Sequence, residues 1–337
     1  MSRRLIIHSV GPGVTVQDLG RPGYLAQGLS RGGAADRKAI FEGAALLGQT
    51  TDFAALEMAG MGGDFEATDS IRIALTGAPM RATCDGDRLV WNASHILPKG
   101  ARLSIGATEA GTYGYLHVGG GLNTKNLLGA KSAHLSARLG ENLSRGVTLE
   151  MGKDAKQDAG WVLDTEDRFS GGKVRIVPSL QTNMFADEDI FRFQSASFQR
   201  DTRGNRMGVR LVQEGSGFES REGLSVLSEV IVPGDIQITG DGTPFVLLSE
   251  CQTTGGYPRI GSVLPSDLPR VAQARPGTKL SFQFVSFEEA MDVESRHRDY
   301  LNGLKSARRP LIRDPHQMTD LLSYQLIGGV TSGDDDS

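Results

Sequence analysis

The densest group of side chains capable of chemistry lies in residues 244–259, which read PFVLLSECQTTGGYPR. An apolar run of strand type, residues 245–248, leads into it, so the polar groups fall on a loop at the end of a strand. Gly255 and Gly256 let the backbone pass close to a ligand, and Pro258 keeps the preceding residue extended. Hydroxyls, an amide and a guanidinium on such a loop suit a binding site. A turn between two strands with incidental polar residues accounts for the pattern equally well.

Two other polar stretches carry charged groups that suit ligand binding. Residues 15–24, TVQDLGRPGY, form a loop in which Asp18 and Arg21 are close enough in sequence to form an ion pair. This contact either pins a turn or presents two charges to a ligand. Residues 201–211, DTRGNRMGVRL, contain three arginines within eight residues. They form either a solvated turn or an oxyanion site, because guanidinium forks match phosphate and carboxylate geometry.

Known catalytic and metal-binding motifs are incomplete in this chain. Residues 28–32, GLSRG, match the pattern of a nucleophile elbow, but the preceding residues make a poor strand, and Gly33 and Asp36 delay the helix. Residues 129–132, GAKS, lack the glycine spacing of a phosphate-binding loop. None of the six histidines stands at ligand spacing from another metal-binding side chain, so no metal site is expected from spacing.

The composition argues against several classes of protein. With 36 Lys and Arg against 40 Asp and Glu, the formal net charge is −4, and nothing indicates nucleic-acid binding. No apolar run approaches the roughly 18 residues that span a bilayer, so no membrane association is expected. The two cysteines, Cys84 and Cys251, form no disulfide framework, which favours a reducing, cytoplasmic location.

Short strands separated by glycine and proline turns dominate the predicted secondary structure. The 44 glycines and the 6% aromatic content fit this pattern better than a helical bundle. The strand spacing predicts a sandwich or barrel, with helices over 35–47 and 287–304. The polar segment 150–172 marks the boundary between two lobes. We therefore expect a mainly β protein with a few helices, of the α+β class.

Several motifs resemble those of the biotin-dependent carboxyltransferase family. They are TVQDLGRPGY at 15–24, AALE at 54–57, IALTGA at 73–78, NRMGVRL at 205–211, QTTGGYP at 252–258 and SDLP at 266–269. The resemblance extends in order over residues 4–290. The family includes the C subunit of the bacterial ATP-dependent 5-oxoprolinase and part of the carboxyltransferase region of urea carboxylase.

The resemblance implies a cyclophilin-like β-barrel architecture in two lobes. We assign residues 4–160 to the N-terminal lobe of a carboxyltransferase-like domain and residues 172–290 to a C-terminal β-barrel lobe. Residues 291–337 then form a helical tail with a disordered acidic end. The chain departs from the common family pattern at SRGGAAD (30–36), at Glu229-Val230 and at Ser249-Glu250, which leaves the substrate open.

The function that the resemblance implies first is that of the C subunit in an ATP-dependent 5-oxoprolinase. Together with the A and B subunits it would open the lactam of 5-oxo-L-proline to L-glutamate, using ATP with or without Mg²⁺. One alternative is transfer of a carboxyl group from biotin to urea or a related amide. The chain lacks an Ala-Met-Lys-Met sequence, so no biotin is expected on it and a carrier protein would supply it. A regulatory protein that sequesters a kinase inhibitor is a third interpretation.

Candidate site residues come from the motifs above, and for each a structural role is the alternative. Developing negative charge would be stabilised by Arg21, Arg206 and Arg259. Substrate would be held by Gln252, Thr254 and the Gly255-Gly256 backbone and oriented by Tyr257. Asp18, Glu57 and Asp267 would bind Mg²⁺ or act as a base. The expected catalytic set is Arg206, Gln252, Tyr257, Arg259 and Asp267; the expected substrate or nucleotide set is Gln17, Asp18, Arg21, Glu57, Thr254, Gly255 and Gly256.

Overall fold

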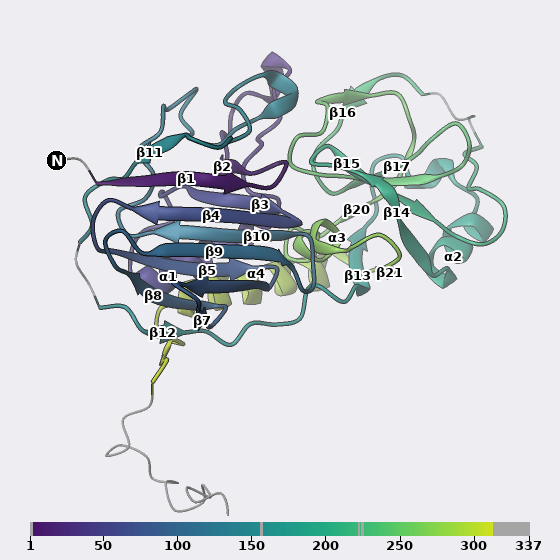
Figure 1. Cartoon of the computed structure of the whole chain (residues 1–337). Helices are drawn as coiled ribbons and strands as arrows, with labels where there is room; N and C mark the ends of the chain where they lie inside the picture. The colour runs from purple at the N-terminus through teal and green to yellow at the C-terminus, as the bar shows by residue number, and fades with distance from the viewer. Residues whose placement is uncertain (1–2, 156–157, 222, 224–225, 313–337) are drawn as a thin grey trace, which may run out of the picture.

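Two stacked β-sheets hold most of the first half of the chain, and a closed β-barrel holds most of the second half. The computed structural model describes residues 3–155, 158–221, 223 and 226–312. Figure 1 shows the stacked sheets on the left and the barrel on the right. The architecture is mainly β with helices at the edges, which confirms the predicted fold class.

The N-terminal lobe contains a six-stranded and a seven-stranded sheet among the described residues. In spatial order the first sheet is β11 (Thr148–Glu150), β1 (Arg4–Val10), β4 (Met61–Ala67), β9 (Arg102–Thr108), β6 (Met80–Cys84) and β7 (Asp87–Leu89). The second is β2 (Thr15–Gln17), β3 (Ala55–Ala59), β10 (Tyr113–Val118), β5 (Ile71–Gly77), β8 (Ala93–Leu97), β12 (Trp161–Val162) and β22 (Arg309–Pro310). The inner faces of the two sheets form one apolar core.

Strand β5 shows why this lobe folds as layers. Every one of its residues is buried, so it forms a continuous buried run rather than an alternating strand. Ile73 and Leu75 face the core between the sheets, whereas Ala74 packs under the helix on the other face. Thr76 donates a hydrogen bond to the carbonyl of Ala39 in that helix, at 3.0 Å. The strand is therefore covered on both sides.

Helix α1 (Arg37–Leu47) covers the outer face of the seven-stranded sheet. Asp36 caps it by accepting a hydrogen bond from Ala39 N, and Gly48 ends it in the left-handed conformation at φ 60°. The helix ends at the predicted residue and begins two residues after the predicted start at residue 35. At Gly43 a side chain would collide with the His117 ring, since an added Cβ would lie 2.3 Å from it. The missing side chain allows α1 to pack closely on β10.

The C-terminal lobe is a closed barrel with one parallel pair. Its order is β13 (Gly172–Val177), β20 (Arg259–Val263), β17 (Asp235–Ile238), β18 (Pro244–Leu247), β15 (Gly208–Val212), β14 (Phe198–Gly204) and β21 (Lys279–Phe284). β13 and β21 run parallel and close the barrel. A separate small sheet joins β16 (Glu229–Val230) to β19 (Thr254–Gly255). Phe193, Phe198, Phe218 and Phe282 stack inside the barrel lobe with ring centroids 4.9–6.0 Å apart.

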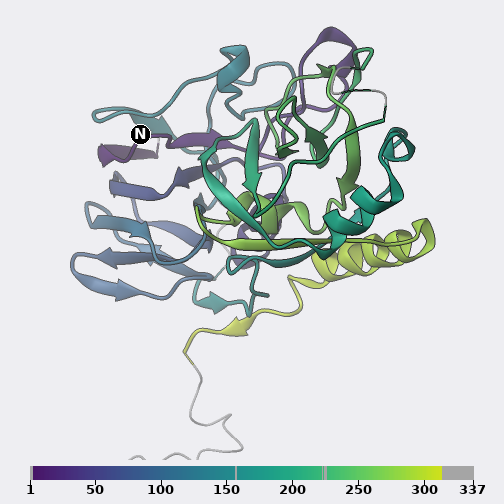
Figure 2. The same cartoon turned by 90° about the vertical axis from the view of Figure 1, so that its right-hand side faces the viewer.

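Three further α-helices and three short 3₁₀ turns complete the described part of the chain. The helices are α2 (Asp187–Ser195), α3 (Leu268–Gln273) and α4 (Phe287–Gly303); the 3₁₀ turns are Leu25–Gln27, Leu135–Ala137 and Thr182–Met184. Figure 2 shows α4 lying along the underside of the barrel lobe before the chain returns to the sheets. There β22 pairs with β12. None of these helices is both long and apolar enough to cross a bilayer.

The SDLP motif at 266–269 leads directly into helix α3, whose first turn includes Pro269. On α4, Glu294 accepts a hydrogen bond from Ser266 N, and Arg298 donates one to Ser295. The acidic end predicted at the C-terminus lies outside the described residues.

A single apolar core continues from one lobe into the other. It joins Ala35, Ala55 and Tyr115 of the N-terminal lobe to the barrel interior, for example Val174 and Phe282. The lobes therefore share buried surface in addition to the linker between β12 and β13. Polar groups that are buried at this junction are held by residues of both lobes.

Candidate functional site between the lobes

Arg206 is the centre of a buried polar cluster where the lobes meet. It lies on the turn between β14 and β15, and its side chain is 11% exposed. Its Nη1 contacts Glu57, its Nε donates to Glu250 at 2.5 Å, and its Nη2 donates to the carbonyl of Gly33. Burial alone would lower the pKa of Arg206, but Glu57 and Glu250 together raise it above the ordinary value. The guanidinium is therefore a permanent cation that holds two acids from different parts of the chain.

Glu57 is the member of the cluster that the N-terminal lobe supplies. It stands on β3 and is 1% exposed. Its Oε2 accepts hydrogen bonds from Ala35 N at 2.8 Å and from the Tyr115 hydroxyl at 2.7 Å. The Tyr115 hydroxyl in turn accepts one from Asp36 N at 2.8 Å. Every oxygen of this carboxylate has a partner, so Glu57 is fixed in one orientation.

Glu250, which follows β18, was not among the predicted site residues. Its Oε2 accepts hydrogen bonds from Leu135 N at 2.9 Å and Ser136 N at 3.3 Å. This carboxylate therefore ties the barrel to a 3₁₀ turn of the N-terminal lobe. The only hint in the sequence is its place in the dense polar stretch 244–259, which does not distinguish it from its neighbours.

His134 and Ser30 lie against this cluster and resemble part of a catalytic triad. Ser30 Oγ lies 2.9 Å from His134 Nε2, and Glu250 Oε2 lies 3.9 Å from His134 Nδ1. However, His134 Nδ1 accepts a hydrogen bond from the backbone N–H of Ala137. A neutral ring then carries its proton on Nε2 and donates it to Ser30, so it cannot take the serine proton. Burial lowers the pKa of His134, which favours this neutral form. The geometry argues against the nucleophile elbow that GLSRG suggested.

Asp18 and Arg21 do not form the ion pair that their spacing suggested. Asp18 accepts hydrogen bonds from Gly20 N at 2.8 Å and Lys131 N at 2.6 Å. Arg21 donates to the carbonyls of Leu127 and Ser132, and its Nη1 has no hydrogen-bond partner among the described residues. Asp18 and Arg21 therefore each bond to backbone groups of residues 127–132 and not to one another.

Gln17 is fixed by the same part of the chain. Its Nε2 donates to Thr15 at 3.0 Å and to the carbonyl of Ala133 at 3.2 Å, while its Oε1 has no partner within the described part of the chain. Gln17 and Arg21 are 0% and 1% exposed. Arg21 also lies near His134, since Gly32 packs between the Arg21 guanidinium and the His134 ring. These two predicted residues therefore border the Arg206 cluster as neighbours.

Arg259 and Asp267 are placed in other contacts, each with an opposite charge. Arg259 contacts Glu229 and lies 3.3 Å from Asp235. Asp267 forms a two-point ion pair with Arg175, at 2.5 and 2.8 Å. The Arg259 contacts join β20 to β16 and β17, and the Asp267 pair joins β13 to the start of α3. Neither residue contacts the Arg206 cluster, so the twelve predicted residues do not form one constellation.

The loop after Glu250 lies at the surface. Gln252, Thr254 and Tyr257 are exposed, and Gly255 pairs with Glu229 in the small sheet. Gly255 lies close to the Gln237 side chain, since an added Cβ would lie 2.4 Å from its Nε2. Gly256, the next residue, is half-buried. The loop is therefore held by its backbone and presents its polar side chains to solvent.

Cys251, which begins this loop, is buried and unreactive. Burial raises the pKa of its thiol to about 12, so Cys251 is no thiolate nucleophile at neutral pH. Together with Gln252 and the 203–208 turn, it lines a shallow cavity of about 480 Å³. Gln252, one of the predicted catalytic residues, thus lines this cavity on the barrel surface.

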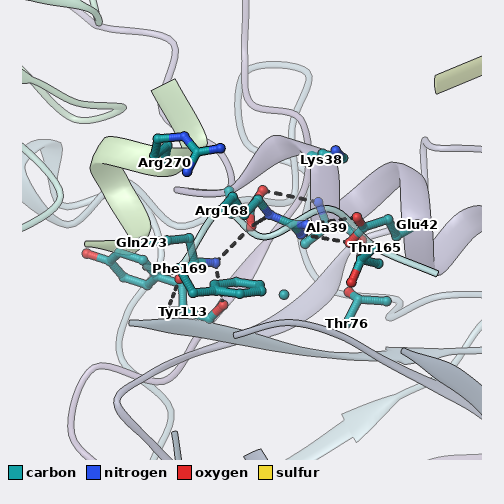
Figure 3. A network of polar contacts seen from close by, with 12 residues as sticks. Lys38, Ala39, Glu42, Thr76, Tyr113, Thr165, Arg168, Phe169, Arg270 and Gln273 are labelled. Atoms are coloured by element: carbon teal, nitrogen blue, oxygen red, sulfur yellow. Dashed lines mark hydrogen bonds and ion pairs between the residues drawn. The ribbon is translucent and has the colours of Figure 1, made fainter. Parts of the chain in front are cut away.

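A second arginine, Arg168 of the linker between β12 and β13, gives all three of its guanidinium nitrogens to carboxylates. Its Nε donates to Asp36 at 2.6 Å, and its other nitrogens donate to Glu42 at 2.9 and 2.7 Å. Gln273 of α3 joins the network by donating to Asp36 at 2.8 Å and to the carbonyl of Tyr113 (Figure 3). Asp36 and Glu42 are both 0% exposed. This network fastens the linker and α3 onto α1.

Among the residues that the structure describes, no three His, Cys, Asp or Glu side chains gather closely enough to hold a metal ion. Glu57 and Asp267 already face arginines, and Asp18 faces backbone amides. The arrangement thus offers fixed charges and hydrogen-bonding groups around the junction of the lobes.

Comparison with known proteins decides the family. Residues 27–284 match the model of the carboxyltransferase domain, subdomain A and B. This chain belongs to that family. The match spans the Glu57, Arg206 and Glu250 cluster and the whole barrel, which confirms the resemblance inferred from the motifs.

Individual relatives of this family member differ in how much of them the chain covers. It is 32% identical to the C subunit of the 5-oxoprolinase of Escherichia coli (strain K12), over 89% of this chain and 97% of that protein. The solved structure of TTHA0988 is 29% identical with a TM-score of 0.78, covering 84% of this chain and 56% of that chain. The urea amidolyase of K. lactis has the same fold at a TM-score of 0.81 and 21% identity, covering 93% of this chain and 21% of that one.

Proposed function

We propose that this chain is the C subunit of an ATP-dependent 5-oxoprolinase that opens 5-oxo-L-proline to L-glutamate together with the A and B subunits. One observation carries the proposal: the 32% identity with the corresponding Escherichia coli protein extends over 97% of that protein. By contrast, the chain covers about a fifth of the K. lactis urea amidolyase, 21% of its length. Similarity to a whole subunit favours the same task more than similarity to one part of a larger enzyme.

The chemistry of the proposed reaction explains the kind of site required. An unstrained lactam is a poor electrophile, and ATP, when bound in the complex, would activate its carbonyl oxygen by phosphoryl transfer. The protein must then orient the lactam, exclude competing water and balance the negative charge that develops. The junction of the lobes has rigid charges suited to this task. Arg206 acts there as a positioning residue, because its donors are already engaged by Glu57 and Glu250.

Of the predicted cations, Arg21 is the one that retains an unused donor. Its Nη1 has no partner within the described residues, whereas Arg206 and Arg259 contact carboxylates. Gln252 and Thr254 are exposed on the barrel lobe. We assign them to the surface on which the A or B subunit docks. ATP and Mg²⁺ belong to the proposal as components of the complex, and no step is assigned to them on this chain.

The fold shared with urea amidolyase keeps carboxyl transfer as the second candidate. The two candidates differ in what must be added for turnover. Oxoprolinase activity requires 5-oxo-L-proline, ATP and the partner subunits. Carboxyl transfer requires a biotin carrier and urea or a related amide.

The test is 5-oxo-L-proline-dependent ATP hydrolysis by the co-expressed subunits, with this chain included or left out. Activity that requires the chain, and that falls in Arg206→Ala or Gln252→Ala, supports the proposal. Gln199→Ala is the matched control, because Gln199 is an exposed glutamine on β14 at another part of the barrel. A stable complex without such activity would overturn the proposal and direct the assay to biotin carriers with urea and other amides.

A further inference from the structure

A cavity of about 400 Å³ opens where α1, the barrel and α4 meet. Its walls are mostly apolar and include Phe41, Leu248, Leu268 and Leu301. Its volume lies in the usual range for small-molecule sites, roughly 300–1,000 Å³. A few polar side chains enter this apolar space, as is typical of sites that orient a ligand. All of the ionisable groups in its lining are basic: Arg31, Arg37, Lys38 and His297.

Two of these groups have no acidic partner. The Arg37 side chain forms no hydrogen bond or ion pair with any described residue, and the Arg31 side chain donates only to the carbonyl of Leu19, at 2.9 Å, within the described part of the chain. Lys38 differs, because its Nζ lies 3.0 Å from Glu166 and is neutralised by it. The charge of Asp18 acts on Arg31 from a distance and offsets part of its charge, whereas the Arg37 side chain has no acidic partner among the described residues.

The same two arginines are close enough to repel one another. Burial, and to a smaller extent the charge of Arg31, lower the pKa of Arg37 to about 10. Burial likewise lowers the pKa of Arg31. Arg31 is exposed to solvent and Arg37 is half-buried, so the repulsion falls mainly on Arg37, and an anion bound between the two guanidinium groups would relieve it. The N-terminus of α1, where Arg37 stands, favours negative charge as well.

The cavity also adjoins the Arg206 cluster. Ser249 lines its wall, and Ser249 Oγ lies 3.4 Å from Arg206 Nη2. The carbonyl of Ser249 accepts a hydrogen bond from Gly32 N at 2.9 Å, which fixes the wall against the 31–35 segment. His297 also lines the cavity, and burial lowers its pKa, so it provides a neutral hydrogen-bonding group. A ligand in this cavity would thus meet cations, a neutral imidazole and the edge of the Arg206 cluster.

We propose that this cavity binds a small organic carboxylate, with the carboxylate held by Arg31 and Arg37 and a compact apolar body against Phe41, Leu248 and Leu268. Guanidinium groups pair with carboxylates at two points, and the apolar walls disfavour strongly hydrated inorganic anions. The site itself follows from the cavity and its charges. The further choice of 5-oxo-L-proline as its occupant rests on the proposed function.

Titration calorimetry on the full chain, alone and with its co-expressed partners, tests the site with three probes. 5-Oxo-L-proline and cyclopentanecarboxylate both carry a carboxylate on a five-membered ring, whereas 2-pyrrolidinone has the lactam without the carboxylate. We expect both carboxylates to bind and 2-pyrrolidinone to bind at least about tenfold more weakly, since charge-assisted hydrogen bonds are lost. Binding of cyclopentanecarboxylate without 5-oxo-L-proline would support the site and count against the proposed substrate. Failure of both carboxylates to bind would overturn the site.

Variants assign the effect to the two arginines. Arg31→Gln and Arg37→Gln should each weaken carboxylate binding about tenfold or more, and Arg37→Lys should restore part of it. Arg298→Gln is the control, because Arg298 is an arginine of α4 that lies outside this cavity. Without ligand, Arg37→Gln should leave the melting temperature unchanged or raise it, because it removes a repulsion. Unchanged affinity in the Arg31→Gln/Arg37→Gln double variant would overturn the proposal.

Discussion

Arg168 and Arg206 each lie between two carboxylates, and the surroundings of the two clusters differ. Arg168 bonds Asp36 and Glu42 through all three of its guanidinium nitrogens, and both acids are 0% exposed. Arg206 divides its donors among Glu57, Glu250 and a backbone carbonyl, and its side chain is 11% exposed. Both clusters border a cavity: Arg168 lines one of about 320 Å³, and Ser249, beside Arg206, lines the one of about 400 Å³. They differ in what they join, since Arg168 ties the linker to α1, whereas Arg206 ties the two lobes together.

This difference separates a structural charge cluster from a functional candidate. Both clusters carry one cation and two acids, so net charge does not distinguish them. What distinguishes them is how the arginine is shared: Arg168 gives all three guanidinium nitrogens to carboxylates, whereas Arg206 gives one to a backbone carbonyl. In the described part of the chain, Arg21 Nη1 and Gln17 Oε1 near Arg206 have no partner, and near Arg168 the Tyr300 hydroxyl also lacks one. Buried polar groups without partners are uncommon in native structures and call for an explanation such as a functional role. The two clusters therefore provide matched variants for experiment.

Arg168→Met should cause the largest loss of stability. It leaves two fully buried carboxylates without a counter-charge, for which losses of about 3–5 kcal/mol are typical. The free energy of unfolding in urea measures this loss. A loss below about 1 kcal/mol would show that this cluster does not stabilise the packing of the linker and α3 on α1.

Lysine substitutions sharpen the contrast between stability and activity. Arg168→Lys and Arg206→Lys both keep the charge and lose the planar fork, so each should lose about 1–3 kcal/mol of stability. Only Arg206→Lys should lower turnover of the proposed 5-oxoprolinase complex, by about tenfold or more, because Glu57 and Glu250 would lose their fixed positions. Equal turnover in the two variants, measured below their melting temperatures, would remove the functional distinction.

Acid should lower the stability of the fold through His117, which lies against Gly43 of α1. Burial lowers the pKa of His117 to about 3, whereas an unfolded histidine titrates near a pKa of about 6.5. Between these values only the unfolded chain binds the proton, so this group lowers the stability by about 1.4 kcal/mol for each pH unit below about 6.5.

The matched variant for this pH effect is His117→Gln, which keeps a hydrogen-bonding group for Thr76. It should reduce the slope of the free energy of unfolding against pH between about pH 6.5 and pH 4, because glutamine does not titrate. Urea unfolding at several pH values measures this slope. An unchanged slope would exclude His117 as its source.

Tyr115→Phe should have the smallest effect and reports on the link between the clusters. The hydroxyl donates to Glu57 and accepts from Asp36 N, so it joins the Arg206 side to the cap of α1. Its loss should cost about 1–2 kcal/mol, because Asp36 N is left buried without its partner. A double-mutant cycle with Arg206→Lys then measures the coupling between the two. Strict additivity would show that the clusters act independently despite the shared hydroxyl.

Parts of the candidate site were open to prediction because the relevant signals are local. The motifs at 15–24, 54–57 and 205–211 singled out Gln17, Arg21, Glu57 and Arg206, and the structure places these residues at or beside the junction of the lobes. Glu250 was seen as a member of a dense polar stretch and not as a partner of Arg206, since a separation of 44 residues carries no pairing signal. Arg259 and Asp267 were assigned to the same site and instead pair within the barrel lobe.

The sequence by itself determined the family, the mainly β class and the ends of α1, because strand spacing, turn glycines and the Asp36 and Gly48 caps act over a few residues. Only the tertiary structure decided which charges meet. Asp18 and Arg21, three residues apart, bond separately to a loop more than 100 residues away, whereas Arg206 and Glu57, 149 residues apart, are in contact. Side-chain pairing depends on the packing of whole lobes, which no local pattern encodes.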